Sequence, residues 1–376
     1  MRFLVLLSVS LAAMLPLLSA SAALPETSAV LAGAAFIKSI QSADGSYGTT
    51  SPGQNMDAVF AVRSAGYDPA KDLVGGKGPA DYLKANAAAA TSAASAAKAA
   101  LGAKALGLDP KSVNGVDLIG RVAAAYNATK GTYAGDDFSQ SIAILGLACT
   151  GNSVPAAAAG ALRATQTTEG GWGFGGASDP DTTAIVVQAL LAAGIPKTDA
   201  ALTKALTYLK ADQAADGGFG YASDTESNVS STAFVVQALI ALGENPESAT
   251  YTKSGATPIS YLLSQQNPDG SFKGFDAAFG TNQVLPALAG RTFCNAPETP
   301  ITRTRPAAVA TPTAQPTTAP PAAATPAPTT PAPAPPNAGN SAGADNGLPR
   351  LAVLSGLLLV LAAGGAAVSL RRRRQA

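Results

Sequence analysis

The 376-residue sequence predicts an all-α protein whose main domain, residues 30–298, is an α6/α6 toroid of six helical hairpins. Six helical stretches rich in small apolar residues each end at a glycine, and these glycines recur every 41 to 49 residues, as in repeated helical units. The stretches have almost no polar face, which indicates helices buried on every side. The glycines are Gly66, Gly107, Gly151, Gly194, Gly243 and Gly290.

Proline follows five of these glycines within four residues, and glycine followed by proline is a typical helix stop. The two most similar stretches run over 183–190 and 232–239 and differ at one position. The helix before each stretch carries more charge, for example Lys204 and Lys210, so we expect an outer layer of amphipathic helices. Two covered layers favour a closed ring, whereas the alternative, an open solenoid, needs polar caps.

A glycine-rich turn with an aromatic residue joins the two helices of most hairpins, and the ring would gather these turns at one mouth. Aromatic rings beside glycine can stack on sugars or flat ligands, so the rings are candidate ligand-binding residues. The alternative is that they pack each turn onto the neighbouring repeat. The candidates are Tyr47, Trp172, Phe174, Phe219, Tyr221 and Phe272.

The composition excludes several function classes. Lysine and arginine number 25 against 24 acidic residues, without a basic patch, so no nucleic-acid partner is expected. The absence of histidine removes Ser-His-Asp mechanisms and the commonest zinc ligand. No metal and no cofactor is expected; the loop 224–228 bears Asp, Glu and Asn but lacks the EF-hand pattern for calcium.

The chain has two cysteines, Cys149 and Cys294. The N-terminal residues predict export from the cell, and an oxidising compartment favours a disulfide between the two cysteines. The repeats that carry them lie far apart around a ring, so the pairing stays open.

Both ends of the chain predict a membrane protein. Residues 1–22 have a positive start at Arg2, an apolar run and small residues at 20–22, which is typical of a cleaved signal peptide; an N-terminal anchor is the alternative. Residues 351–370 carry no charge and match the thickness of a bilayer. The basic tail 371–376 contains four arginines, which indicates a cytoplasmic end.

The linker 299–347 is rich in proline, alanine and threonine, a composition that favours an extended, disordered stalk. We therefore expect a single-pass type I protein of the cell membrane, with an extracellular toroid held away from the bilayer. Its partners would be the membrane, through the C-terminal helix, and an unknown small ligand, glycan or surface protein.

The turns and the helices that follow them resemble the prenyltransferase and squalene oxidase repeat. The turn reads Gln-x-x-(Asp/Glu)-Gly-(Gly/Ser)-aromatic-Gly, and the following helix reads Thr-Ala-x-x-x-x-Ala-Leu over 183–190 and 232–239. The resemblance covers about residues 30–293 and implies the α-α toroid of terpenoid cyclases and protein prenyltransferase β subunits. It specifies a fold better than a function, since sites are grafted onto folds.

The resemblance implies two candidate catalytic residues. Class II terpenoid cyclases protonate an alkene with the middle acid of an Asp-x-Asp-Asp-Thr-Ala motif, and this chain has Asp179 and Asp181 with Thr182 in place of the third acid. Asp181 would be the proton donor. The alternative is that Asp181 or Thr182 caps the helix that starts there. Prenyltransferase β subunits hold zinc with Asp, Cys and His, a set that a histidine-free chain cannot assemble.

We therefore expect a membrane-anchored binding module for a small ligand, glycan or protein partner, without catalysis. The chain has one tryptophan, lacks the second helical domain with which cyclases enclose a polyprene, and is exported. The first alternative is a terpenoid-cyclase-like enzyme that uses Asp181 as its acid. The second is a structural or adhesive surface protein.

Overall fold

The computed structural model describes residues 27–48, 52–223 and 225–300, which lie in one compact unit. These residues form twelve α-helices, and no β-strand is present among them, as expected for an α-α toroid. The expected signal peptide, the membrane helix, the basic tail and all but the first two residues of the linker lie outside the described residues. Within the described part, no helix is long and apolar enough to cross a membrane.

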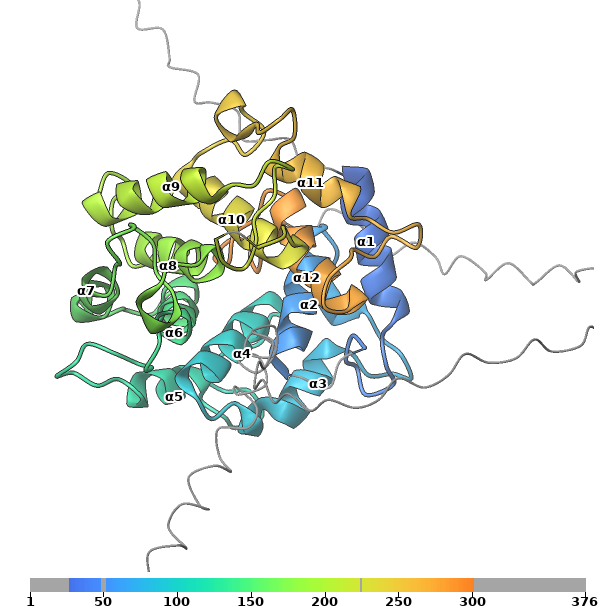
Figure 1. Ribbon diagram of the computed structural model, residues 1–376. Helices are drawn as coiled ribbons and strands as arrows, with labels where there is room; N and C mark the ends of the chain where they lie inside the picture. Colours follow the sequence, from blue (N-terminus) through green and yellow to red (C-terminus); the bar gives the residue numbers. More distant parts are fainter. Residues whose placement is uncertain (1–26, 49–51, 224, 301–376) are drawn as a thin grey trace, which may run out of the picture. The chain divides into compact units, whose positions relative to one another are not determined.

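The helices alternate along the chain between an outer and an inner position (Figure 1). The inner helices are α2 (Pro52–Ser64), α4 (Ala93–Ala105), α6 (Asp137–Cys149), α8 (Pro180–Ala192), α10 (Val229–Leu242) and α12 (Ala277–Leu288). The outer helices are α1 (Thr27–Ser39), α3 (Pro79–Asn86), α5 (Leu118–Ala124), α7 (Ala156–Ala164), α9 (Ala200–Asp212) and α11 (Pro258–Ser264).

The inner helices form a closed ring. Each packs against the next one along the chain, and α12 packs against α2. The first and last repeats therefore cover each other, and the open solenoid is not the arrangement found. Because every inner helix follows its outer helix in the same sense, all six inner helices run in parallel. We call the end of the ring at their N-termini the N-terminal mouth, the opposite end the C-terminal mouth, and the interior between the six inner helices the lumen.

Short polar side chains set the start of the inner helices. Asp136, Asp179, Asn228 and Asp276 each accept a hydrogen bond from the backbone N–H three residues later. This is the usual N-cap interaction, which satisfies one of the free N–H groups at a helix start. At the other end of α10, Gly243 has a φ of 83°, a left-handed conformation that stops the helix.

Two sets of hydrogen bonds fix the turns. One set joins each turn to the inner helix that follows it, and the other set joins neighbouring repeats. The backbone N–H of Trp172 donates to Thr183 Oγ1 at 2.9 Å, and Phe219 and Phe272 do the same to Thr232 and Thr281. A glutamine after an outer helix then bridges to the next repeat. Gln266 Nε2 donates to the carbonyl oxygen of Ala29 at 2.9 Å, which links the last repeat to the first.

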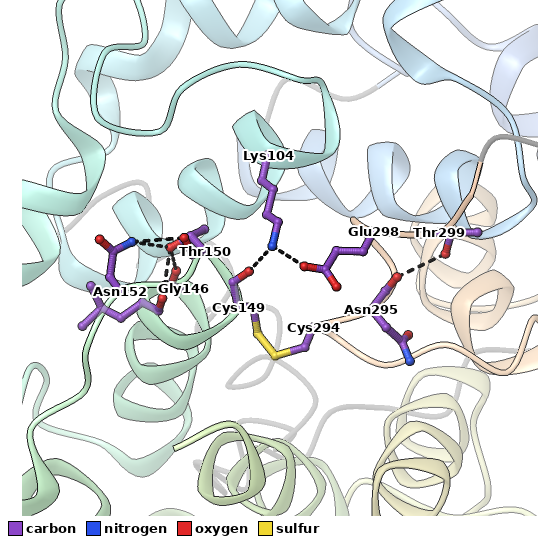
Figure 2. Close-up of polar contacts among 10 residues, drawn as sticks. Lys104, Gly146, Cys149, Thr150, Asn152, Cys294, Asn295, Glu298 and Thr299 are labelled. Atoms are coloured by element: carbon purple, nitrogen blue, oxygen red, sulfur yellow. Dashed lines mark hydrogen bonds and ion pairs between the residues drawn. A yellow bond between two sulfur atoms is a disulfide. The ribbon is translucent and has the colours of Figure 1, made fainter. Parts of the chain in front are cut away.

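Residues 291–300, which we call the plug, lie across the C-terminal mouth (Figure 2). Cys294 forms a disulfide with Cys149 at the end of α6, and Glu298 forms an ion pair with Lys104 of α4. The ring of Phe293 packs edge-on against Phe60 of α2. The two cysteines meet because the plug crosses the mouth, although their repeats lie far apart around the ring.

Candidate active site

A pair of phenylalanine rings shows which helix positions face the lumen. Phe138 of α6 and Phe234 of α10 lie 6.2 Å apart between ring centres, edge to face. Helices α6 and α10 flank α8 and are not neighbours in the ring. Outer helices cover the other side, so the two rings meet inside the lumen in front of α8.

Asp181 occupies the same register as Phe138. Phe138 is the second residue after the cap Asp136, and Asp181 is the second residue after the cap Asp179. Asp181 therefore lies at the lumen side of the N-terminal mouth. It also lies next to the first turn of α10, where the Ser231 hydroxyl interacts with its carboxyl group.

The surroundings of Asp181 favour the neutral carboxylic acid. The residue is half-buried, yet its Oδ1 atom is completely buried and has no hydrogen-bond partner among the described residues. Burial, followed by the negative charge of Asp179, raises the pKa of Asp181 to about 8, against the opposing effect of Ser231. Near neutral pH the group therefore carries a proton, as a general acid must.

Asp179 has a different task. It accepts hydrogen bonds from the backbone N–H of Thr182 at 2.6 Å and from the Thr182 hydroxyl at 2.9 Å. Burial raises the pKa of Asp179 to about 6, while the bonds from Thr182 act in the other direction. The helix cap is thus Asp179, and the idea that Asp181 or Thr182 caps α8 is wrong. Asp181 is left without a capping role.

Most of the aromatic candidates lie inside the turns. Tyr47, Trp172, Phe219 and Phe272 have no exposed surface. The Trp172 indole N–H donates to the carbonyl oxygen of Leu162 at 2.6 Å. A ring without exposed surface cannot stack on an arriving ligand, so these four residues pack the turns onto the repeats, which is the alternative given above.

Phe174 and Tyr221 are the two aromatic candidates that keep exposed surface. Phe174, on the short 3-10 helix Phe174–Gly176 just before α8, is 41% exposed, and Tyr221 is half-buried. Phe174 shares its turn with Asp179, so it is the candidate nearest in sequence to the acid. The ligand-binding role of both residues stays a prediction.

The lumen also contains a polar cluster that the sequence analysis did not single out. Asp57 of α2 forms an ion pair with Lys98 of α4 at 2.8 Å, and Gln283 Nε2 of α12 lies 3.4 Å from Asp57 Oδ2. Burial raises the pKa of Asp57, while the charge of Lys98 acts to lower it. The sequence carries no signal that brings these three residues together, because they lie on the inner helices of three different repeats.

The described residues contain no group of three or more His, Cys, Asp or Glu side chains placed to hold a metal ion. Asp224, the first residue of the loop considered for calcium, lies outside the described part of the chain.

Comparison with known proteins points to terpene cyclases. Residues 135–285 match the squalene-hopene cyclase C-terminal domain. The fold is similar to that of the type II terpene cyclase MstE from Scytonema. The structure of MstE in complex with its substrate geranylgeranyl dihydroxybenzoate is 15% identical in sequence and has a TM-score of 0.51. That match covers 70% of this chain and 96% of the other. The structure with the product merosterolic acid A is 16% identical in sequence and has a TM-score of 0.52. That match covers 72% of this chain and 97% of the other. Comparison with curated protein sequences gives no match.

These findings confirm the resemblance stated from the repeats: the chain has the terpenoid cyclase-like α-α toroid fold. They also correct the main functional expectation. A non-catalytic binding module was expected, but both the matched domain and the similar structures are those of cyclases. The enzymatic alternative is therefore favoured over the binding module.

Proposed function

We propose that this chain is a class II terpenoid cyclase-like enzyme, in which Asp181 starts the cyclisation of a polyprenoid by protonating its terminal alkene. The matched domain includes α8, and the similar structures hold geranylgeranyl dihydroxybenzoate as substrate or merosterolic acid A as product. The fold is compatible with this class of chemistry, and the environment of Asp181 and the Phe138–Phe234 pair support it further.

The observation that carries the proposal is the environment of Asp181. An alkene is a very weak base, so its protonation requires an acid that stays protonated and is held away from water. Asp181 meets both conditions, because Oδ1 is buried without a partner among the described residues and burial raises the pKa of the group to about 8. Asp179 keeps its own task as the helix cap and adds negative charge that opposes ionisation of Asp181.

The proposed reaction is an isomerisation. The Asp181 O–H bond breaks, its proton forms a C–H bond at one alkene carbon, and the other alkene carbon becomes a tertiary carbocation. Internal double bonds then attack the cation and form the rings. The last cation loses a proton to water at the mouth, and the Asp181 carboxylate regains a proton from solvent, so the atoms of substrate and product are the same.

The Phe138–Phe234 pair supports the same assignment. The two rings lie in the lumen in front of α8, the helix that carries Asp181. The face of an aromatic ring attracts a nearby cation by about 0.5–2 kcal/mol, more where water is excluded. In the proposal these rings stabilise the carbocation that protonation forms.

The place of action is also part of the proposal. A toroid exported by the signal at 1–22 and anchored by 351–370 would work on a lipid at the outer face of the cell membrane. The Cys149–Cys294 disulfide supports this assignment, since such bonds persist in oxidising compartments. The membrane in which the chain is anchored is then the source of its apolar substrate.

The test is turnover of a polyprenoid by the purified full chain. We expect geranylgeraniol to be converted to cyclic isomers, detected by gas chromatography and mass spectrometry, and Asp181→Asn to lower the rate by at least about a hundredfold. Asp117→Asn is the matched control, because asparagine caps an exposed helix start as well as aspartate does. Equal rates for the wild type and Asp181→Asn would overturn the role of Asp181.

A further inference from the structure

We propose that the cavity between α2, α10, α12 and the plug binds the head group of the polyprenoid, and that it selects a small uncharged hydrogen-bond donor such as a hydroxyl group. The inference rests on the proposed function, which it extends from the site of protonation to the class of substrate. It assigns a specificity role to Asn282.

The cavity is built from three inner helices and the plug. Asp57 and Phe60 come from α2, Gln237 from α10, and Asn282, Gln283 and Pro286 from α12, while Phe293 and Ala296 of the plug form its end. Helices α2 and α10 are separated by α12 in the ring, so a cavity that touches both lies in the lumen. Its walls thus combine a carboxylate and three amides with two aromatic rings.

Asn282 is the residue in this cavity with an unused hydrogen-bonding group. Its side chain is 2% exposed, and its Oδ1 atom is buried without a partner among the described residues. Leaving a buried acceptor unsatisfied costs about 1–3 kcal/mol. An occupant that donates a hydrogen bond to Asn282 Oδ1 recovers this free energy, whereas an occupant that only accepts hydrogen bonds does not.

The charges around the cavity disfavour an anionic head group. Among the described residues that line it, Asp57 is the one that is charged, and Asp57 is paired with Lys98. A diphosphate placed here would meet a carboxylate, and the described lining of the cavity contains no lysine or arginine to neutralise it. Burying such an unpaired charge is much more costly than burying a hydroxyl group.

The size of the cavity points to a small group. Its enclosed part is no larger than a water molecule. A hydroxyl group fits this space, while the apolar chain has to lie elsewhere in the lumen.

The depth of the cavity agrees with the position of the acid. Asn282 is the sixth residue after the cap of α12, and Asp181 is the second after the cap of α8. At 1.5 Å per residue, Asn282 is about 6 Å deeper than Asp181 when measured from the N-terminal mouth. The cavity therefore lies farther from the N-terminal mouth than the acid does, on the side of the plug.

The experiment compares two probes that share a geranylgeranyl chain and differ in their head group with a third, squalene, that has no head group. Binding of geranylgeraniol, geranylgeranyl diphosphate and squalene is measured by calorimetry on the full chain carrying Asp181→Asn, so that no turnover intervenes. We expect the alcohol to bind at least about tenfold more tightly than the diphosphate. Adding Asn282→Leu should weaken the alcohol about tenfold and leave squalene within about twofold, since squalene has no group to donate.

Asn86→Leu, at the end of the outer helix α3, is the matched control and should change none of the three affinities. Tighter binding of the diphosphate, or alcohol binding that is unchanged by Asn282→Leu, would overturn the inference. If the leucine variant does not fold, Asn282→Ala replaces it. Turnover is measured separately. The expected binding pattern without turnover by the wild type refutes the proposed function alone, and turnover without the pattern refutes the head-group inference alone.

Discussion

At the scale of single residues, the balance of forces at Asp181 explains why this carboxyl group stays neutral. The N-terminus of a helix attracts negative charge, and Asp181 lies in the first turn of α8, which by itself stabilises the anion by about 0.3–1 kcal/mol. Removing an unpartnered carboxylate from water costs several kcal/mol. Burial is the larger effect, so the proton stays on, and the neighbouring Asp179 reinforces this outcome.

This balance predicts that Asp181→Asn stabilises the protein in a pH-dependent way. The pKa of Asp181 is about 8 in the folded state, above its ordinary 3.8. Between these values the folded state holds a proton that the unfolded state has lost, so the stability of the wild type falls as pH rises from about 4 to 8. Asparagine does not titrate, so the variant does not lose this part of its stability as the pH rises.

The measurement is the melting temperature of both proteins at pH 4 and pH 8. We expect nearly equal values at pH 4 and a variant that melts at least about 4 °C higher at pH 8, given 2–4 °C per kcal/mol for a domain of this size. A difference that does not grow with pH would show that folding leaves the pKa of Asp181 near its ordinary value.

At the scale of helices, small residues set how closely the inner helices approach one another. A Cβ atom added to Gly146 of α6 would collide with both the side chain and the backbone of Ala97 in α4. Backbone cannot move aside as a flexible side chain can. The glycine is therefore required by contact with the neighbouring helix, because its own helical conformation is open to any residue.

Two glycine substitutions test this contact. Gly146→Ala should destabilise the protein by about 1–3 kcal/mol, the usual range for overpacking a core. Gly160→Ala, in the outer helix α7, adds a Cβ with nothing within 4 Å and should stabilise by about 0.5–1 kcal/mol, because alanine is the better helix former. Urea denaturation measures both. Effects of the same sign would contradict the close packing of α4 and α6.

Much of the helical arrangement could be predicted from the sequence, because its signals are local. Glycine and proline mark helix ends, and an apolar helix without a polar face must be buried, as α8 and α10 are. The aromatic residues of the turns could also be recognised from the sequence. They allowed two interpretations, which were ligand binding and packing of the turn onto the neighbouring repeat. Sequence alone could not decide between them, because the burial of Trp172 depends on the neighbouring repeat.

The site was less predictable, because it depends on contacts between distant repeats. The motif around 179–184 made Asp181 a candidate acid, but the sequence analysis expected Asp181 or Thr182 as the alternative helix cap, and only the geometry of the turn shows that Asp179 caps α8. In the lumen, Asp57 of α2 and Lys98 of α4 meet Gln283 of α12, which comes more than 180 residues later in the chain. Nothing in the local sequence of any one of them indicates the other two.

At the scale of the whole molecule, the ring is closed twice, once by α12 packing on α2 and once by the plug. The disulfide between Cys149 and Cys294 joins residues 145 positions apart. Closing a loop of this length restricts the unfolded chain by about 4–5 kcal/mol in the chain-entropy estimate. The plug also makes a hydrogen bond from Phe293 N–H to Gln188 Oε1 at 3.1 Å.

We therefore expect Cys149→Ser with Cys294→Ser to lower the free energy of unfolding by about 2–5 kcal/mol. Limited proteolysis should then cut near residues 291–300 before it cuts the ring, because the plug has lost its covalent attachment. Treating the wild type with a reductant serves as the matched comparison. An unchanged stability, or first cleavage within the inner helices, would contradict the role of the plug as a tethered closure of the C-terminal mouth.

The central claim is that Asp181 delivers a proton to carbon, and isotope labelling tests it most directly. The full chain is incubated with geranylgeraniol in D₂O, and the products are analysed by mass spectrometry. We expect cyclic isomers with one deuterium bound to carbon, and no such products from Asp181→Asn. Products without carbon-bound deuterium, or the same labelled products from Asp181→Asn, would contradict it.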